Sequence, residues 1–148
     1  MLTYTKNNCL VSIVITYYKK KKFLSKTLNS IKSQIYNNYE IIFVYDDPDL
    51  SDIHFVKKSL SIFKKKKLLV NSRNLGVAKS RNRAMKYCRG TYLAFIDSDD
   101  LWKKNKLSYQ LNIMERYSSL FSFTSYDVID EKDKLLKKRE VNNDGNFS

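Results

Sequence analysis

The stretch Tyr92-Leu-Ala-Phe-Ile-Asp-Ser-Asp-Asp100 decides the fold of this chain and points to its chemistry. Its first five residues are an apolar run, which predicts a buried strand followed directly by three carboxylates, Asp97, Asp99 and Asp100. Ligands of open α/β sheets bind at the carboxyl ends of the strands. Crowded carboxylates repel one another unless a cation compensates them, and Mg²⁺ and Mn²⁺ take oxygen ligands of this kind. The stretch therefore predicts that Asp97, Asp99 and Asp100 hold Mn²⁺ or Mg²⁺ and the anion that the metal carries.

Outward from this stretch, strand-like and helix-like patterns alternate along the chain. Apolar runs predict strands at about 10–16, 39–45, 67–70, 92–96 and 121–128. Apolar residues at helical spacing predict helices at about 24–35, 53–63, 76–88 and 103–117, the second of them capped by Asp49 or Ser51. This alternation implies right-handed crossovers between parallel strands. We therefore expect an α/β, Rossmann-like fold with an open, twisted, mostly parallel sheet and helices on both faces.

Phosphate-binding glycine motifs are missing from the sequence. No G-x-G-x-x-G follows the first predicted strand, and no G-x-x-x-x-G-K-[ST] occurs anywhere in a chain with only three glycines. A dinucleotide-binding domain and a P-loop enzyme are thereby excluded. We expect the metal site, rather than a glycine-rich backbone loop, to hold phosphate.

Polar and aromatic residues follow the other predicted strands. They are Thr16, Tyr17 and Tyr18 after the first strand, Asp46 and Asp47 after the second, and Asn74 after the third. The carboxyl ends of parallel strands lie at one edge of the sheet, so these residues should gather there with the acidic stretch. We expect different residues of this group to contact different parts of one bound nucleotide. Plainer alternatives are a helix cap for one of the acids after residue 96, a strand-ending turn before Pro48, and surface tyrosines.

Arg81 stands in the apolar stripe of the third predicted helix, between Val77 and Ala84. A buried guanidinium is costly without a partner. We expect Arg81 to point toward an anion near the start of its helix, either a carboxylate of the rim or a ligand phosphate. The alternative is an arginine that reaches solvent from a partly exposed face.

Length and composition favour one cytoplasmic domain. The 148 residues suffice for one domain, expected at 1–129, and the polar remainder, 130–148, is expected to be a loose tail. Cys9 and Cys88 fit neither a disulfide framework nor a metal knuckle, which favours a reducing compartment. No apolar run is long enough for a membrane span or a signal peptide.

A net charge of +13, from 28 Lys and Arg against 15 Asp and Glu, favours anionic partners. Much of the excess lies in two lysine runs, 19–22 and 64–67. Each run is either a solvated helix end or a cationic surface that keeps the protein near phosphate ligands or the anionic inner face of a membrane.

Five motifs in order then resemble a known family. They are Val11-Ser-Ile-Val-Ile-Thr-Tyr-Tyr18, Phe23-Leu-x3-Leu-x2-Ile-x2-Gln34, Tyr39-Glu-Ile-Ile-Phe-Val-Tyr-Asp-Asp47, Asn74-Leu-Gly-Val-Ala-Lys-Ser-Arg-Asn82 and Arg89-Gly-Thr-Tyr-Leu-Ala-Phe-Ile-Asp-Ser-Asp-Asp-Leu-Trp102. Together they closely resemble the family 2 glycosyltransferases of the GT-A fold, over residues 11 to 117. The order and spacing of the five motifs make this resemblance specific.

The resemblance implies an inverting transferase that uses a nucleotide-diphosphate sugar, with a UDP-sugar favoured, and Mn²⁺ or Mg²⁺. By analogy, Thr16 and Tyr18 line the base pocket, Asp47 contacts the base, and Arg81 lies near the nucleotide. Asp99 reaches the ribose or the sugar, and Asp100 binds the metal with support from Asp97. The implied acceptor is a hydroxyl of a glycan or of a lipid-linked molecule.

The sequence departs from the family pattern at two motifs. Asp46-Asp47 is followed by Pro48-Asp49 where the family has Gly-Ser, and Thr16 and Lys19 replace the Pro and Asn common around the first-strand motif. The family's catalytic base and acceptor-binding half lie well downstream of the acidic stretch, and no motif selects a base among Asp127, Asp130 and Glu131. The sequence is therefore expected to stop before the acceptor half of the GT-A fold. One alternative is a donor-binding domain that needs a partner or a continuation. The other, a basic module for single-stranded nucleic acid, is disfavoured because the lysine runs are not interleaved with aromatics and the acidic rim repels phosphates.

Overall fold

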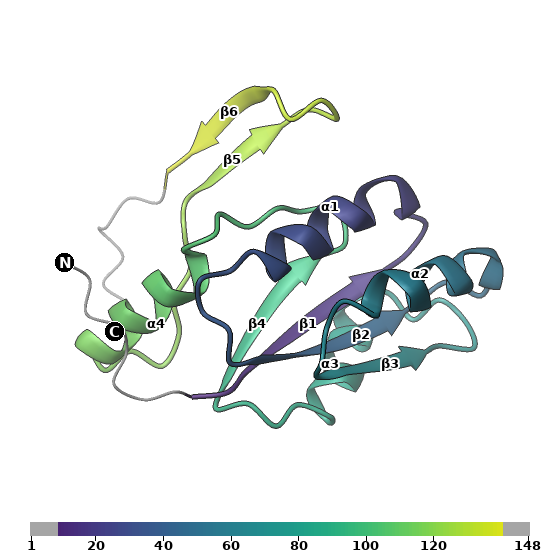
Figure 1. Cartoon of the computed structure of the whole chain (residues 1–148), viewed down its shortest axis with the longest axis horizontal. Helices are drawn as coiled ribbons and strands as arrows, with labels where there is room; N and C mark the ends of the chain where they lie inside the picture. The colour runs from purple at the N-terminus through teal and green to yellow at the C-terminus, as the bar shows by residue number, and fades with distance from the viewer. Residues whose placement is uncertain (1–8, 141–148) are drawn as a thin grey trace. The chain divides into compact units, whose positions relative to one another are not determined.

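Four parallel strands form the central sheet in the computed structural model, which describes residues 9–140. The strands are β1 (Val11–Tyr17), β2 (Tyr39–Tyr45), β3 (Lys66–Val70) and β4 (Tyr92–Asp97). Their order in the sheet is β3-β2-β1-β4, with β1 between β2 and β4 (Figure 1). The registers place Thr16 opposite Val44 on one side and Asp97 on the other. The carboxyl ends of these strands therefore form one edge, as the sequence predicts.

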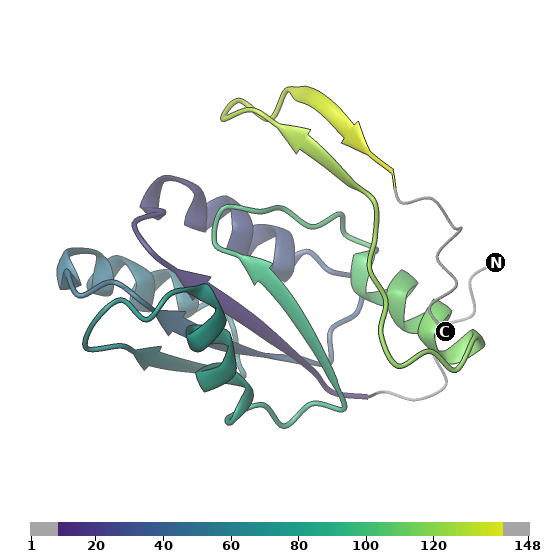
Figure 2. The ribbon, with the colours of Figure 1, turned by 180° about the vertical axis from the view of Figure 1, so that it is seen from behind.

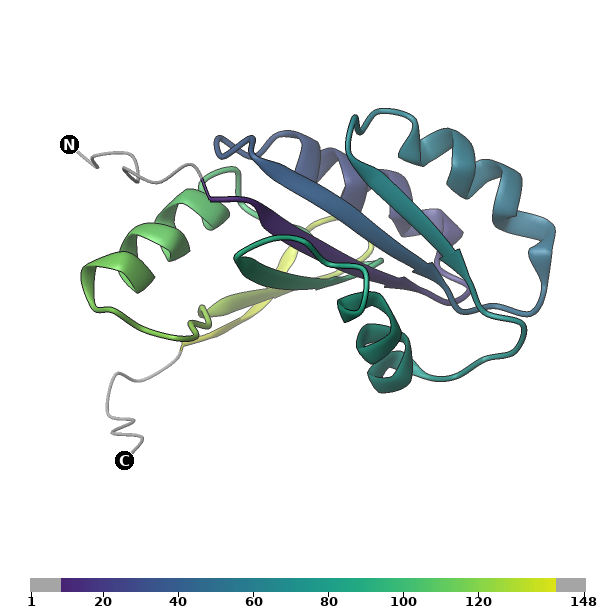
Figure 3. The ribbon, with the colours of Figure 1, turned by 90° about the horizontal axis from the view of Figure 1, so that it is seen from below.

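Helices cover both faces of this sheet. The helices are α1 (Lys21–Lys32), α2 (Ile53–Leu60) and α3 (Val77–Met85), and a 3₁₀ turn, η1 (Leu50–Asp52), precedes α2. Figure 3 shows α1 and α2 on one side of the strands and α3 on the other, and α3 is seen from behind in Figure 2. The Asp49 side chain accepts a hydrogen bond from Ser51 N (2.9 Å), which confirms Asp49 as the cap of the turn that leads into α2.

The core consists of two apolar layers, one on each face of the sheet. Successive strand residues point to opposite faces, so β1 and β2, which are buried almost throughout, supply both layers. The layer between α3 and the sheet contains Val14, Ile42, Val44, Leu69 and Ala84, with Cys88 packed against it. The buried residues of α1 and α2 are Leu24, Thr27, Leu28, Ile31, Val56 and Leu60. Burial on both faces explains why the sequence of these strands is nearly continuously apolar rather than alternating. The prediction of a buried strand at 92–96 is wrong in this respect: β4 lies at the edge of the four-stranded sheet, where Leu93 and Phe95 are exposed and Ile96 is buried.

A second compact unit begins at Gln110, within α4 (Lys106–Arg116). It contains the antiparallel pair β5 (Tyr126–Ile129) and β6 (Leu135–Arg139). The sequence predicts one strand at 121–128, but the strand found there, β5, begins only at Tyr126. It predicts no strand in 130–148, so β6 is an element that the pattern did not reveal. Its Leu-Leu-Lys-Lys-Arg sequence has no alternation to mark it, because all five of its residues are exposed. The outer parts of the expected domain and tail, residues 1–8 and 141–148, lie outside the described residues.

Several element ends differ from those expected. α1 ends at Lys32, so Ile35, expected on its apolar stripe, lies beyond the helix and is 42% exposed. α3 ends at Met85 rather than Cys88, and α4 begins at Lys106 rather than Lys103. Phe63 and Cys88 still pack on the core beyond the ends of α2 and α3, so apolar spacing overestimates the length of these two helices, whereas Ile35 lies outside the core. Within the described residues, no helix has the length and apolar character required to span a bilayer.

Candidate functional site

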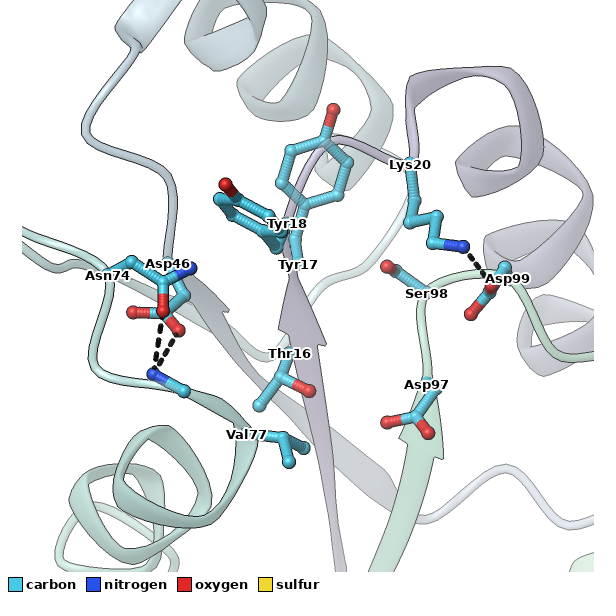
Figure 4. Close-up of a pocket in the computed structure, with 11 residues that line it drawn as sticks. Thr16, Tyr17, Tyr18, Lys20, Asp46, Asn74, Val77, Asp97, Ser98 and Asp99 are labelled. Atoms are coloured by element: carbon cyan, nitrogen blue, oxygen red, sulfur yellow. Dashed lines mark hydrogen bonds and ion pairs between the residues drawn. The ribbon is translucent and has the colours of Figure 1, made fainter.

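A cavity of about 470 Å³ opens at the carboxyl edge of the sheet. We call it the carboxyl-edge cavity. Its lining residues come from the ends of β1, β2 and β4 and from the segment before α3, and they are Thr16, Tyr17, Tyr18, Lys20, Asp46, Asn74, Gly76, Val77, Asp97, Ser98 and Asp99 (Figure 4). Of the predicted site residues, Thr16, Tyr18, Asp97 and Asp99 thus lie together at one cavity. Its volume is in the range of small-ligand sites.

Asp46 holds the wall of this cavity that leads into α3. Its side chain is almost fully buried, and one carboxylate oxygen accepts hydrogen bonds from Asn71 Nδ2 (2.6 Å) and Leu75 N (2.8 Å). The other oxygen accepts from Gly76 N (2.9 Å). Gly76 has a φ of +79°, a conformation that glycine adopts without steric cost. A buried carboxylate thus fixes the turn between β3 and α3.

Asp47, the residue predicted to contact the base, is also buried but does not line the cavity in this structure. Its Oδ1 accepts from Asp49 N (3.1 Å), the local turn that Asp side chains commonly make. The strand-ending turn anticipated before Pro48 is therefore present. A contact of Asp47 with a nucleotide base stays a prediction.

The segment Asp97–Asp100, called here the acidic turn, is paired with two cations. Arg81 Nη2 donates to Asp97 Oδ1 at 2.8 Å, so Arg81 reaches a rim carboxylate, one of the two partners expected from its place on α3. Lys20 Nζ lies 2.8 Å from Asp99 Oδ2 (Figure 4). This hydrogen bond and charge raise the pKa of Lys20. Sequence reasoning missed Lys20 because it stands within a lysine run that looks like solvated surface.

The pKa of Asp100 reflects its burial and its charged neighbours. Burial raises the pKa of Asp100 above its ordinary value, and the charges of Asp97 and Asp99 raise it further, while Arg81 opposes them. Carboxylate oxygens are ligands that hard divalent cations prefer, so the donor chemistry of Asp97, Asp99 and Asp100 fits Mn²⁺ or Mg²⁺. However, among residues 9–140 no three acidic, histidine or cysteine side chains are gathered closely enough to hold a metal ion. The three-carboxylate metal site therefore stays a proposal, and a metal that binds Asp99 through Oδ2 would compete there with Lys20.

Polar residues of α1 and of the turn after it bind the acidic turn and the segment that follows it. Thr27 Oγ1 donates to Ser98 O (3.0 Å), and Ser30 Oγ accepts from Trp102 N (3.1 Å). Gln34 then donates to Lys103 O (2.9 Å) and accepts from Leu107 N (3.1 Å). These side chains satisfy backbone groups from Ser98 to the first turn of α4. The sequence signal of Thr27 and Ser30 is a pair of small polar residues, three positions apart, in an amphipathic helix.

The two tyrosines that end β1 have different roles. Tyr17 is fully buried and stacks on Tyr45 (centroids 5.1 Å apart), while Tyr18 is 44% exposed at the cavity. The Tyr17 hydroxyl donates to Asp52 Oδ2 (2.6 Å), and Lys21 Nζ lies 2.8 Å from Asp52 Oδ1. Tyr17 is therefore not the surface tyrosine that one alternative anticipated. The Tyr17 hydrogen bond ties the end of β1 to the turn before α2, and the Lys21 ion pair ties the first turn of α1 to the same turn.

Comparison with known proteins identifies the family. The sequence matches Glycosyl transferase family 2 over residues 12–147. The chain belongs to this family. Its fold is accordingly the GT-A type of α/β fold, with the parallel sheet described above. This family 2 chain spans between about a fifth and about half of the length of the curated relatives that it matches.

Two relatives and one solved structure illustrate the similarity. An uncharacterized glycosyltransferase from Rickettsia bellii is 38% identical over 141 residues, which are 93% of this chain and 19% of that protein. The Escherichia coli UDP-Glc:alpha-D-GlcNAc-diphosphoundecaprenol beta-1,3-glucosyltransferase WfaP is 40% identical over 131 residues, 86% of this chain and 49% of WfaP. S. aureus TarS 1–349 superposes with a TM-score of 0.66 at 25% identity, over 73% of this chain and 33% of TarS. TarS has also been solved in complex with UDP.

Proposed function

We propose that this chain binds the sugar donor of an inverting, metal-dependent glycosyltransferase, and that the donor is a nucleotide-diphosphate sugar, with UDP as the favoured nucleotide. The observation that carries the proposal is the carboxyl-edge cavity, where Thr16, Tyr18 and two carboxylates of the acidic turn meet. The names of WfaP and of the TarS complex, which both mention UDP, support the choice of nucleotide.

In this proposal each part of the cavity meets one part of the donor. Tyr18 and Thr16 take the base, assisted by Asp47, and Asp99 accepts a hydrogen bond from a ribose or sugar hydroxyl. Asp97, Asp99 and Asp100 hold Mn²⁺ or Mg²⁺, which when bound neutralises the charge that develops on the diphosphate. Arg81 is placed by its bond to Asp97 to orient that carboxylate and to add positive charge near the nucleotide. The Lys20 ammonium, once released from Asp99, is within the same cavity and can pair with phosphate.

The reaction that this arrangement would serve is a single displacement. An acceptor hydroxyl attacks the anomeric carbon from the side opposite the diphosphate, the bond from that carbon to the diphosphate oxygen breaks, and a carboxylate base takes the hydroxyl proton. The described residues do not single out this base. We propose a glycan or lipid-linked acceptor because WfaP is named for a diphosphoundecaprenol acceptor. The lysine runs are consistent with work beside the anionic inner face of a membrane.

Calorimetric titration with UDP, with and without Mn²⁺, tests this proposal. We expect binding that strengthens at least tenfold with Mn²⁺, and loss of that gain in Asp97→Asn and Asp99→Asn. Glu115→Gln, which removes an exposed acid of α4, is the matched control and should bind as the parent does. Nucleotide binding that is absent, or equal in all variants, would overturn the proposal.

Two further measurements separate the alternatives. Turnover of a bound UDP-sugar distinguishes an active transferase from a domain that only binds donor. A single-stranded oligonucleotide tested over a salt series covers the nucleic-acid alternative, for which steeply salt-dependent binding without any UDP binding is expected.

A further inference from the structure

A second cavity lies at the opposite, amino-terminal edge of the same sheet. It has a volume of about 420 Å³ and is called here the amino-edge cavity. Its lining residues come from the starts of β2 and β3 and from the segment between α3 and β4, and they are Glu40, Ile42, Lys66, Lys67, Tyr87 and Arg89. None of them lines the carboxyl-edge cavity. Nothing in the proposed transfer reaction uses this cavity.

The one acid of the amino-edge cavity is already satisfied by the protein. Glu40 is 2% exposed, and its Oε1 accepts from Ser12 Oγ (2.7 Å) and Arg89 N (2.8 Å). Its Oε2 accepts from Arg89 Nε (3.1 Å) and Nη2 (2.9 Å). Burial by itself raises the pKa of Glu40, but the donors from Arg89 and Ser12 outweigh burial and hold this pKa below its ordinary value. Glu40 is therefore a fixed, ionised anchor for Arg89 rather than a charge available to a ligand.

Arg89 is oriented by this anchor and still has donors to offer. A guanidinium carries five N–H groups in a planar fork, and Glu40 takes one from Nε and one from Nη2. The Arg89 side chain remains 75% exposed. A guanidinium fixed along one edge, with its other edge open to solvent, is preorganised for a second planar or tetrahedral oxyanion.

One lysine adds to the positive charge of Arg89 on this face of the sheet. Lys67 Nζ lies 4.1 Å from the centroid of the Tyr87 ring, a cation–π contact that leaves its charge in place. Lys66 also borders the cavity, but successive strand residues point to opposite faces, and its Nζ donates to Phe63 O (2.7 Å). Among the described residues that line the cavity, Lys67 is thus the positive charge that remains beside the balanced Glu40–Arg89 pair. This charge and the open donors of Arg89 favour an oxyanion such as a phosphate monoester, which carries about −1.5 to −2 at neutral pH.

We propose that the amino-edge cavity binds a phosphate ester. Phosphate oxygens would accept from the open edge of Arg89 and from the Lys67 ammonium group, and the group bearing the phosphate would lie against the Tyr87 ring. The cavity is larger than phosphate alone requires, so the ligand is a phosphorylated molecule. This chemistry is shared by a soluble sugar phosphate and by a lipid phosphate head group, and the experiment distinguishes them.

The test uses the whole chain, labelled with ¹⁵N, without metal or nucleotide. Glucose 1-phosphate is the soluble probe, and cosedimentation with phosphatidylcholine vesicles, with or without phosphatidic acid, is the lipid arm. We expect saturable amide shifts at Lys66, Lys67, Tyr87 and Arg89, or phosphatidic acid-dependent cosedimentation. Lys66→Gln/Lys67→Gln should weaken the response at least tenfold. Lys57→Gln/Lys58→Gln, which removes the same charge from exposed positions of α2, should change it less than twofold.

Each outcome is decisive for this site and independent of donor binding. Shifts with glucose 1-phosphate identify a soluble ester, and cosedimentation alone identifies a lipid head group. Binding of neither probe, or an equal loss in the two double variants, would overturn the proposal, because the second result means diffuse attraction to the net charge. A preserved amide spectrum in both variants verifies that they are folded.

Discussion

Replacing Lys20 by methionine should tighten the binding of Mn²⁺ to the acidic turn. In the present structure the Lys20 ammonium lies 2.8 Å from Asp99 Oδ2, so a metal that binds Asp99 through this oxygen competes with the ion pair. Methionine keeps most of the length and the apolar contacts of the lysine stem while removing the charge. Lys20 therefore acts as a counter-ion of the cluster in the absence of metal.

The exposure of the pair sets the size of the effect. The Lys20 and Asp99 side chains are 46% and 34% exposed, and ion pairs this open to solvent contribute up to about 1 kcal/mol. Removing that competition should lower the Kd for Mn²⁺ by about fivefold at low ionic strength, since 1.4 kcal/mol corresponds to a factor of ten. The gain should shrink as salt is added, because screening already weakens the pair in the parent protein.

Titration of Mn²⁺ followed by electron paramagnetic resonance measures this Kd directly, without nucleotide. Lys19→Met is the matched control, because it removes a charge of the same run whose ammonium lies over the Tyr18 ring, 5.2 Å from its centroid. A second readout is the gain in Mn²⁺ affinity caused by UDP, which should fall in Lys20→Met because the released ammonium no longer assists the diphosphate. An unchanged or weaker Mn²⁺ affinity in Lys20→Met, with Lys19→Met like the parent, would refute the reasoning.

Three further predictions concern stability. Gly90→Ala should lower the free energy of unfolding, measured with urea, by about 1 to 3 kcal/mol, because the new Cβ would lie 2.5 Å from Ser12 N. A loss below about 0.5 kcal/mol, the range of neutral surface substitutions, would contradict this close packing. Asp46→Asn should lower the free energy of unfolding by about 1 to 3 kcal/mol, since an amide cannot accept every hydrogen bond that the carboxylate accepts. The NMR amide signals of residues 71–76 should broaden, and sharp, unshifted signals would contradict this prediction. Hydrogen bonds from Lys21 and Tyr17 lower the pKa of Asp52, so the stability that Asp52 contributes should be complete above about pH 4 and should decline as the pH falls through the lowered pKa. Urea unfolding of the parent and Asp52→Asn between neutral and acid pH measures this difference, and a gap that stays constant down to pH 3 or so would contradict it.

The sequence predicted most of the first unit because its signals are local. Continuous apolar runs in β1 and β2 reflect strands buried on both faces, and the four helices were predicted at the right places with errors confined to their ends. The gathering of Thr16, Tyr18 and the acidic turn at one edge follows from strand direction alone. β6 escaped prediction because an exposed hairpin strand has no buried face to impose a pattern.

Other features of the site depend on the distances between side chains that are far apart in the chain. The sequence does not distinguish Asp46 from Asp47, yet only Asp46 anchors the turn before α3 and lines the carboxyl-edge cavity. Lysine runs look alike in sequence, yet Lys20 meets Asp99, while Lys66 and Lys67 border a second cavity at the other edge.

The sequence by itself thus determined the order of strands and helices, the family, and the edge of the sheet at which acids collect. The tertiary structure alone decided which charges compensate one another, namely Lys20 with Asp99, Arg81 with Asp97, and Arg89 with Glu40. The physical reason is the separation along the chain of the residues involved. The apolar periodicity of a helix or strand can be read from a few neighbouring residues, whereas these ion pairs form only when packing brings two side chains that are distant in sequence within hydrogen-bonding distance.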